Sequence, residues 1–206
     1  MNTKTSTPAD PSAFENHVER TLSSLTLEEK IGQLMCPSLG DKSGDDLKAL
    51  LEKVPLGCAF FSDWEIESTR EHIRILQESS RVPVLIAGDM ESGPAFGTCF
   101  PNAMGCSAAG AENRMYERGR ITAREAKAAG FNWSFAPCVD IGMNFRNVET
   151  GLRAWGDTAE QVKRMVVPVI QGMQDGGLAA TAKHFPGTGM DDRDQHLCTA
   201  VNSLSV

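Results

Sequence analysis

Side chains that can move protons or bind hydroxyl groups gather at three places in the sequence, each where an apolar segment ends. Asp89 and Glu91 follow the apolar run 82–88. A second group follows the run 131–139 and consists of Asp140, Asn144, Arg146, Asn147 and Arg153. The third begins at the end of the run 178–183 and consists of Lys183, His184, Asp191, Asp192, Arg193, Asp194 and His196. Carboxylates, cations and imidazoles in this combination suit acid–base catalysis and the binding of polar ligands.

The apolar runs are the predicted strands of a parallel sheet. They lie at 54–62, 82–88, 131–139 and 178–183, and the chain is also expected to be extended near Met35 and Cys36. Helical patterns separate them, which is typical of β-α units around a parallel sheet. Ligands bind at the carboxyl ends of the strands in such folds. The three polar groups are therefore expected to converge on one active site of a single α/β domain.

Helical periodicity predicts helices at 45–53, 66–80, 111–129 and 159–175. The segment Thr26-Leu27-Glu28-Glu29 fits a capping box and predicts a further helix that continues through Leu34. Pro168 is expected to kink or interrupt the helix over 159–175, because proline has no amide to donate. Residues 1–11 are expected to be a loose polar tail.

The composition of the 206 residues excludes several classes of protein. Hydrophobic residues make up 41% and charged residues 23%, which is ordinary for a globular domain. The net charge of −7 disfavours binding to nucleic acid. No run approaches the roughly 18 apolar residues of a membrane span, and Met1–Pro11 has no apolar core, so we expect a cytoplasmic protein without membrane contact. The six cysteines form no C-x-x-C pair and are expected to be reduced, mostly buried thiols.

The motifs of several other chemistries are missing from the sequence. There is no P-loop, no G-x-G-x-x-G after a strand, no H-E-x-x-H and no G-x-S-x-G. Nucleotide binding and serine hydrolysis are disfavoured accordingly.

The segment 183–196, KHFPGTGMDDRDQH, resembles the N-terminal catalytic barrel of glycoside hydrolase family 3, in particular its β-N-acetylhexosaminidase branch. That branch carries Lys-His-Phe-Pro-Gly-x-Gly followed by Asp-x-His. Five upstream segments also resemble the family: 31–35 (IGQLM), 89–93 (DMESG), 100–101 (FP), 135–140 (FAPCVD) and 153–157 (RAWGD). The resemblance covers about residues 25–206. The chain departs from it at Thr188, where the family often has His, and at 94–97, which lack an arginine that the family often carries.

The resemblance implies an α/β fold that is part of a (β/α)₈ barrel of the TIM type, about the first four or five β-α units. Residues 1–24 would be a tail and lead-in, and residues 25–206 the barrel part. The family's nucleophile is an Asp on a later strand, downstream of Asp-x-His, and nothing here matches it. We therefore expect residues 1–206 alone to hydrolyse no glycoside and to be poorly stable, because an open barrel leaves strand edges unpaired.

The resemblance also implies the role of each site residue in a retaining hydrolysis of terminal β-linked N-acetylglucosamine. His196 would be the acid/base and Asp194 its orienting partner, since a carboxylate stabilises a charged imidazole. The candidate substrate-binding residues are Asp89, Arg153, Lys183 and His184; weaker candidates are Glu91, Asp140 and Arg146. Trp133 and Trp155 are expected to pack in the core. The expected partner is a carbohydrate, and no cofactor is expected.

Three alternatives stay open at this point. One is a β-glucosidase of the same family, although such enzymes usually place the acid/base elsewhere. The second is a catalytically silent truncated fragment that at most binds sugar. The third is a metal site, for which the candidate ligands would be His184, Asp191, Asp192, Asp194 and His196.

Overall fold

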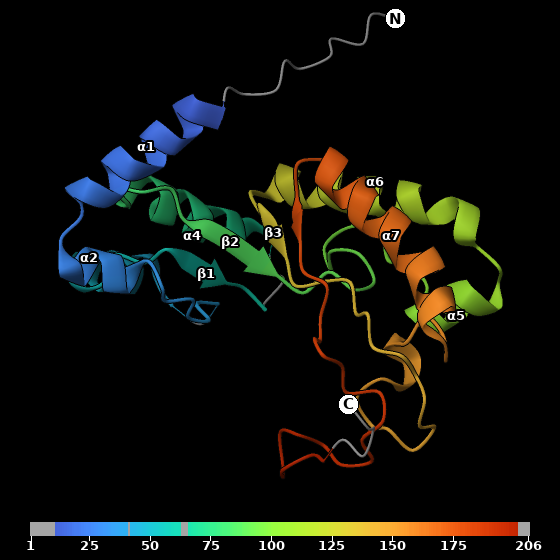
Figure 1. The fold of residues 1–206 in the computed structure, drawn as a ribbon. Helices are drawn as coiled ribbons and strands as arrows, with labels where there is room; N and C mark the ends of the chain where they lie inside the picture. The colour runs from blue at the N-terminus through green and yellow to red at the C-terminus, as the bar shows by residue number, and fades with distance from the viewer. Residues whose placement is uncertain (1–10, 41, 63–65, 202–206) are drawn as a thin grey trace, which may run out of the picture.

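The computed structural model describes residues 11–40, 42–62 and 66–201 (Figure 1). Its centre is a sheet of four parallel strands in the order in which they occur in the chain. These strands are β1 (Cys58–Phe60), β2 (Leu85–Gly88), β3 (Trp133–Ser134) and β4 (Ala179–Ala180). Ser38 forms a parallel bridge to Phe60, which adds an extended segment at the β1 edge of the sheet. The predicted parallel sheet is therefore confirmed.

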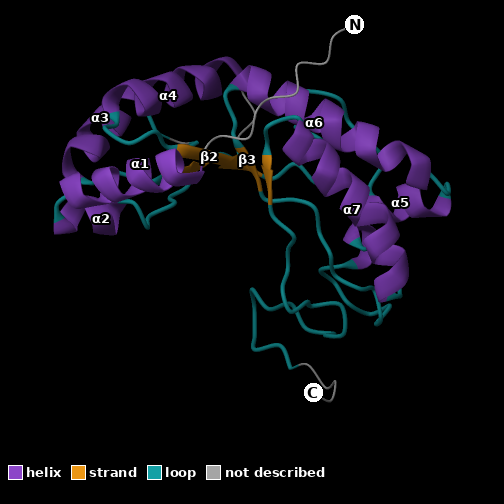
Figure 2. Cartoon of the chain, turned by 45° about the horizontal axis from the view of Figure 1, so that its top comes forward, coloured by secondary structure: helices purple, strands orange, loops and turns teal. Residues whose placement is uncertain are grey.

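The helices form an arc on one side of the sheet (Figure 2). They are α1 (Pro11–Ser24), α2 (Leu27–Gly32), α3 (Gly44–Lys53), α4 (Ile66–Ser79), α5 (Ala103–Ala108), α6 (Met115–Ala129) and α7 (Ala159–Asp175). Two 3₁₀ turns lie at Glu112–Arg114 and Gly151–Arg153. A curved parallel sheet whose outer side is covered by an arc of helices is the geometry of part of a (β/α)₈ barrel.

The hydrophobic core lies between the sheet and the arc of helices. Leu47 of α3, Leu76 of α4 and Ile86 of β2 have no exposed surface there. Helices α6 and α7 approach each other closely where Gly119 of α6 faces Val169 of α7. A Cβ on Gly119 would lie 2.2 Å from the Val169 carbonyl oxygen, so a larger residue would push the helices apart. This packing fixes the carboxyl ends of β3 and β4 side by side.

Aromatic side chains cover the inner face of the sheet, opposite the helices. Phe61 stacks on His72 of α4 and so faces the helices. Successive strand residues point to opposite faces, so Phe60 faces inward. Phe60 stacks on Phe135 at 5.4 Å between ring centroids, and Trp133 packs edge-on against the same ring at 4.8 Å.

Several predicted elements are confirmed, and others need correction. The capping box is present, because the Thr26 hydroxyl accepts from the amide of Glu29 and the Glu29 carboxylate accepts from the amide of Thr26. Helix α7 has the predicted bounds and is continuous from Ala159 to Asp175, so Pro168 does not interrupt it. The alternative expectation, that Pro168 kinks the helix, stays a prediction. The single amide that proline lacks is outweighed by burial of the apolar side of α7.

The N-terminal segment also differs from the prediction. Pro11 begins helix α1, so the lead-in is helical from that residue, and the rest of the expected tail lies outside the described residues. Among the helices of the described ranges, none has the length and apolarity that a membrane crossing demands. The expectation of mostly buried cysteines is wrong in part, because Cys36, Cys99 and Cys198 are exposed.

Candidate active site

The ends of β2 and β4 bring two carboxylates and a lysine together. The Lys183 ammonium nitrogen lies 2.5 Å from Asp89 Oδ1 and 2.8 Å from Glu91 Oε1. The guanidinium of Arg153 donates two hydrogen bonds to Glu91, at 2.9 and 2.7 Å. Asp89, Lys183 and Arg153 are predicted site residues, and the structure brings all three together near the carboxyl ends of the strands. Glu91, a weaker candidate in the sequence, contacts both Lys183 and Arg153 and so joins the cluster.

The environment of Glu91 keeps it ionised. Burial raises its pKa, but the hydrogen bonds from Arg153 and Lys183 outweigh this effect and bring the pKa to about 2. Burial lowers the pKa of Lys183, and its hydrogen bonds to Asp89 and Glu91 reverse that effect, so the pKa lies above its ordinary value. Because these groups stay charged at neutral pH, they can orient polar ligands but are poor proton donors and acceptors.

His184 is held by Asp140, which follows β3. Asp140 Oδ2 lies 2.7 Å from His184 Nδ1 and accepts from the His184 amide at 3.2 Å. Its Oδ1 accepts from the amide of Thr188 at 2.7 Å. Burial raises the pKa of Asp140, but these hydrogen bonds prevail and the pKa is lowered. Asp140 is only 2% exposed, so its role is to hold the loop after Lys183 and to orient the His184 ring.

His196 lies between two carboxylates. Its Nδ1 is 2.8 Å from Asp194 Oδ1 and 2.7 Å from Glu149 Oε1, and its amide donates to Asp194 Oδ1 at 2.8 Å. The hydrogen bond to Asp194 and the charge of Glu149 raise the pKa of His196. The side chain is 72% exposed. The ring therefore has a fixed Nδ1 and leaves Nε2 to act on a ligand.

Glu149 connects the His196 pair to the strand-end cluster. Its Oε2 lies 3.6 Å from Arg153 Nη1, while its other oxygen faces His196. Ionisable groups of alternating sign thus run in one series, consisting of Asp89, Lys183, Glu91, Arg153, Glu149, His196 and Asp194. Sequence reasoning missed Glu149. The available signal was its position four residues before Arg153 in the loop after β3.

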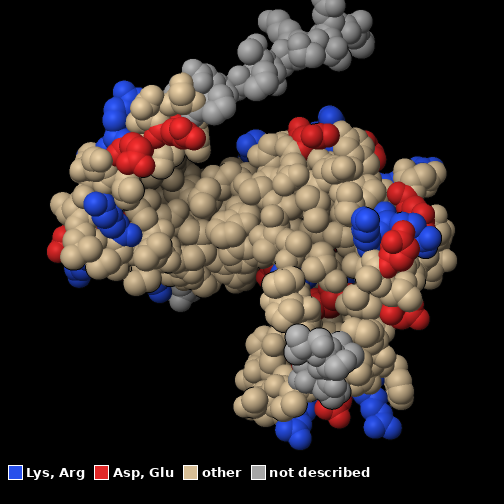
Figure 3. Space-filling model, in the orientation of Figure 1, with Lys and Arg blue, Asp and Glu red and all other residues tan. Residues whose placement is uncertain are grey.

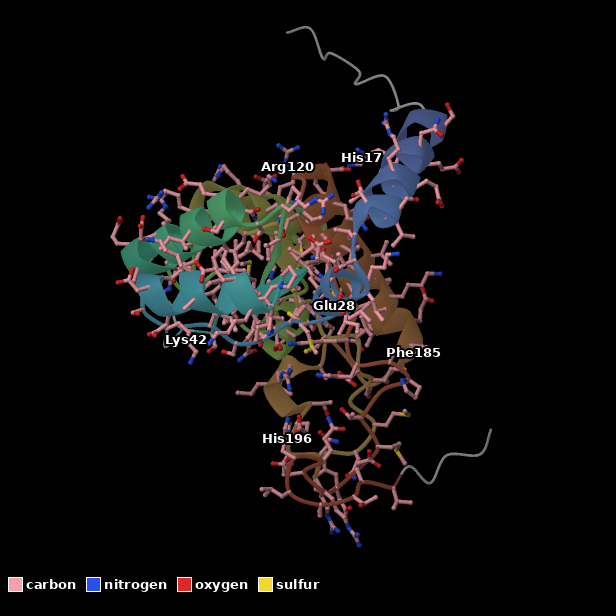
Figure 4. The ribbon with its side chains drawn as sticks, turned by 90° about the vertical axis from the view of Figure 1, so that its left-hand side faces the viewer. His17, Glu28, Lys42, Arg120, Phe185 and His196 are labelled. Carbon is pink, nitrogen blue, oxygen red and sulfur yellow. The ribbon has the colours of Figure 1, made fainter. Side chains whose placement is uncertain are left out.

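The two long loops after β3 and β4 form a lobe that projects from the sheet (Figure 1). The side chain of Asn147 joins them. Its amide donates to the carbonyls of Thr188 and Asp191 at 2.5 and 2.7 Å. Its oxygen accepts from the amides of Glu149 and Thr150. In Figure 4, His196 lies within this lobe, and Phe185, which is 92% exposed, lies nearer the sheet.

A close backbone contact also fixes the lobe. A Cβ on Gly189 would lie 1.7 Å from the carbonyl oxygen of Ile141, so only glycine fits at this crossing of the two loops. Gly187 has a φ of +114°, a conformation that glycine adopts without strain. The glycines of the KHFPGTG segment therefore allow the loop that carries His196 to pack against the loop that carries Glu149.

Arg118 of α6 is only 4% exposed and contacts backbone groups next to the site. Its guanidinium donates to the carbonyls of Pro101 and Glu91, at 2.8 and 2.5 Å. It also lies 5.1 Å from the ring centroids of both Phe100 and Trp155. Arg118 thus ties the turn that carries Glu91 to the loop next to Arg153. The sequence contained no signal for this role, because Arg118 lies within a helix rich in charged residues.

The remaining candidates lie away from the charge series or serve packing. Arg146 stacks on the exposed ring of Phe145 at 5.6 Å. Trp155 is 2% exposed and packs in the core as predicted. Trp133 does not: it is half-buried on the inner face of the sheet, where its indole donates to the Thr181 hydroxyl at 2.8 Å.

The five-residue metal site is not assembled. His184 lies with Cys138 and Asp140, whereas His196 lies with Glu149 and Asp194, and these are two separate groups of possible ligands. Burial raises the pKa of the Cys138 thiol to about 12, which disfavours the thiolate that a metal requires. The groups around His196 already satisfy one another through hydrogen bonds. The prediction that no cofactor is needed stays a prediction.

The surface view shows how charged side chains are distributed over one face of the molecule (Figure 3). In Figure 3, acidic atoms are visible where the lower lobe meets the body, and basic atoms lie at the tip of the lobe. A cavity of about 100 Å³ lies beside the charge series and is lined in part by Glu91, Cys138 and Arg153. A small cavity with both polar and apolar lining thus lies next to the charge series.

Comparison with known proteins agrees with this architecture. Residues 26–205 match the glycosyl hydrolase family 3 N-terminal domain. The chain is 35% identical over 193 residues to a β-N-acetylglucosaminidase/β-glucosidase of Cellulomonas fimi, covering 92% of this chain and 34% of that protein. It is 39% identical over 86 residues to a β-hexosaminidase of Stenotrophomonas maltophilia (strain K279a), covering 42% of this chain and 25% of that protein.

Solved structures are similar as well. A β-glucoside phosphorylase, BglX, superimposes with a TM-score of 0.86 and 36% identity, covering 92% of this chain and 35% of that one. A family 3 β-N-acetylglucosaminidase from Paenibacillus sp. str. FPU-7 superimposes with a TM-score of 0.76 and 35% identity, covering 84% of this chain and 35% of that one.

The fold and the match define an N-terminal domain of the glycoside hydrolase class. The chain belongs to glycosyl hydrolase family 3. It spans about a third of the length of the Cellulomonas fimi protein.

Proposed function

We propose that this chain supplies the N-terminal part of the catalytic barrel of a retaining β-N-acetylhexosaminidase, which removes terminal β-linked N-acetylglucosamine. The placement of His196 carries the proposal. Its Nδ1 faces the carboxylates of Asp194 and Glu149, while the ring is 72% exposed. A protonated imidazole held in this way can donate the Nε2 proton to a departing glycosidic oxygen.

The chemistry requires two proton transfers at the same nitrogen. His196 first protonates the leaving oxygen and then, as a neutral base, takes a proton from the attacking water. Asp194 fixes the ring orientation and stabilises the charged form. We assign no nucleophile among residues 1–206; the family resemblance places that aspartate downstream of His196.

The strand-end cluster would bind the sugar. Asp89 accepts hydrogen bonds from sugar hydroxyl groups, and its side chain is 48% exposed. Lys183 and Arg153 donate to hydroxyl or acetamido oxygens at the same edge. His184 offers Nε2, because Asp140 occupies its Nδ1. These contacts support a small, polar, hydroxyl-rich ligand.

The acid role is tested by varying the leaving group. The protein used is residues 1–206 extended by the C-terminal part of the Cellulomonas fimi relative, because the proposal requires a downstream nucleophile. His196→Ala should lower turnover of substrates with poor leaving groups by about 10²–10⁴-fold, the usual contribution of a general acid. Activated aryl N-acetyl-β-glucosaminides should lose less, because their leaving oxygen needs little protonation. Equal losses on both substrates would remove His196 from the acid role.

The sugar is tested in the same assay. Hydrolysis of aryl N-acetyl-β-glucosaminide should exceed that of the matching aryl β-glucoside, and the reverse would favour the β-glucosidase alternative. The unextended chain should show no turnover with either substrate. Binding of N-acetylglucosamine to the unextended chain, followed by NMR, would then show whether residues 1–206 recognise the sugar.

A second candidate activity is transfer of the sugar to phosphate. It is favoured by the likeness to the β-glucoside phosphorylase structure. With inorganic phosphate in the assay, a phosphorylase would release a sugar 1-phosphate, and a hydrolase would release the free sugar.

A further inference from the structure

Two cysteines, Cys36 and Cys58, lie in contact at the β1 edge of the sheet. Neither belongs to the charge series of the candidate active site. Cys36 is in the extended segment that leads to Ser38, and Cys58 is the first residue of β1. Their sulfur atoms are 2.7 Å apart. Both thiols are free in this structure, and a disulfide bond would bring the sulfurs to about 2.05 Å.

The backbone places the two residues opposite each other. Ser38 pairs with Phe60 in parallel register, and two residues earlier on each strand stand Cys36 and Cys58. The amide of Cys58 donates to the Met35 carbonyl at 3.1 Å, so the pairing continues past the cysteines. Neighbouring strands lie about 4.8 Å apart, which is within the Cα separation of about 4.4–6.8 Å that a disulfide spans. The register of the two segments therefore places the pair within the reach of a disulfide bond.

The two thiols differ in access to solvent. Cys36 is exposed, whereas Cys58 is 6% exposed. An oxidant in solution can reach Cys36 directly, and the sulfur of Cys58 lies behind it in contact, at 2.7 Å. This arrangement of one accessible and one resolving thiol is that of a redox-sensitive pair.

We propose that Cys36 and Cys58 are an oxidation site that forms an intramolecular disulfide by exchange with a low-molecular-weight disulfide such as oxidised glutathione. The Cys36 thiolate attacks one glutathione sulfur and expels a glutathione thiolate, which gives a mixed disulfide. The Cys58 thiol then loses its proton to water, attacks the Cys36 sulfur and expels the second glutathione thiolate. Two protein thiols are oxidised, and one oxidised glutathione is reduced to two glutathione molecules.

Burial of Cys58 determines how the exchange depends on pH. Burial and the contact with Cys36 raise the pKa of Cys58 to about 12. A backbone hydrogen bond from Ala59 acts in the opposite direction and lowers this pKa. The Gln33 side chain donates to the Pro55 carbonyl. The rate of the second step should therefore rise with pH between 7 and 9, because the thiolate is the attacking species.

The experiment uses the full chain in glutathione buffers of graded composition at pH 8. Free thiols are then alkylated, and the non-reduced digest is mapped by mass spectrometry. We expect a linked Cys36–Cys58 peptide, a loss of two hydrogen atoms from the intact mass, and a higher melting temperature for the oxidised chain. Cys99→Ser and Cys198→Ser, which remove the other exposed thiols, should leave this linkage unchanged, and Cys36→Ser should abolish it.

Two results would overturn the proposal. One is a glutathione adduct that stays on Cys36 without transfer to Cys58. The other is a linkage yield in concentrated urea equal to the yield under native conditions, since that would show that the folded geometry contributes nothing. Both measurements use the unmutated chain, so neither depends on the folding of a variant.

Discussion

At the scale of single residues, the site is a set of charges that hold one another in place. Glu91 accepts from Arg153 and Lys183, and Glu149 stands between Arg153 and His196. A change at one member therefore alters the titration of its neighbours. The properties of His196 follow from this arrangement as much as from the Asp-x-His motif itself.

Glu149→Gln should lower the pKa of His196. The Glu149 carboxylate stabilises the charged imidazole, so its loss favours the neutral form. Asp194→Asn should lower the pKa further, because the Asp194 hydrogen bond is the largest cause of the elevation. Titration of the imidazole protons by NMR measures both effects, with the exposed Glu160→Gln as the matched control. An unchanged His196 titration in Glu149→Gln would contradict the contact.

Arg118→Met should destabilise the fold by roughly 1–3 kcal/mol, since it removes the buried guanidinium that donates to two part-buried carbonyl groups. The carbonyls are those of Glu91 and Pro101. Urea unfolding measures the loss. Arg120→Met on the exposed side of the same helix is the control, and Figure 4 shows Arg120 at the molecular surface. If both variants lose equal stability, the interior contacts of Arg118 contribute nothing specific.

At the scale of elements, the structure shows how the loops after β3 and β4 meet. Asn147 bonds across them, and Gly189 lets their backbones cross at Ile141. Their packing, and not the Asp-x-His spacing alone, brings His196 to Glu149. Each loop thus contributes one of the two residues that form this contact.

Gly189→Ala should separate the two loops. The added methyl group would lie 1.7 Å from the Ile141 carbonyl oxygen, so the backbone must move. We expect a lower melting temperature and a lower pKa of His196, because Glu149 no longer stands beside it. Gly151→Ala is the matched control within the lobe, since nothing lies within 4 Å of its added methyl. Equal effects of the two substitutions would refute the crossing as the cause.

The sequence predicted most elements because their signals are local. The Thr26 capping box and the apolar face of α7 act within a few residues of themselves. Helix α1 was missed, although Phe14, Val18 and Leu22 recur at helical spacing. The strands are shorter than their apolar runs. In β3 the regular strand ends at Ser134, and the pairing toward the β4 segment resumes at the bridge between Cys138 and Lys183.

The site was predicted only as far as strand ends and motifs reach. Asp89, Lys183 and Arg153 could be placed at one edge because parallel strands end together. The position of Glu149 four residues before Arg153 was a local signal for the ion pair with Arg153. It could not predict the contact with His196, which joins residues 47 positions apart (196 − 149) through two irregular loops. No periodicity specifies such a contact, and it depends on the side chain of Asn147.

At the scale of the whole molecule, paired carboxylates make stability depend on pH. The folded-state pKa of Glu91 is about 2, below its ordinary value of 4.5. Its contribution is therefore fully present above about pH 4.5 and is lost as the pH falls toward 2. The lowered pKa of Asp140 acts in the same direction. Acid should thus weaken the region where the strand ends meet.

Glu91→Gln should remove this dependence in part. The lowering of the Glu91 pKa from 4.5 to about 2 corresponds to on the order of 3 kcal/mol of folding stability at neutral pH. The variant should be less stable than the unmutated chain at pH 7, and the difference should shrink as the pH falls below 4.5. Urea unfolding at pH 7, 4.5 and 3 measures it, with the exposed Glu67→Gln as control. A difference that stays constant over this range would contradict the lowered pKa.

The side chain of Asn147 has a consequence for how this domain can vary in length. Surface loops usually accept inserted residues at little cost, because loop closure depends only weakly on loop length. Here one amide group fixes the spacing of two loops at once, through Thr188, Asp191, Glu149 and Thr150. An insertion between Asp140 and Asn147 would have to preserve all of these bonds. We expect grafts and insertions to be tolerated between helices α1 and α2 and to fail in the lobe.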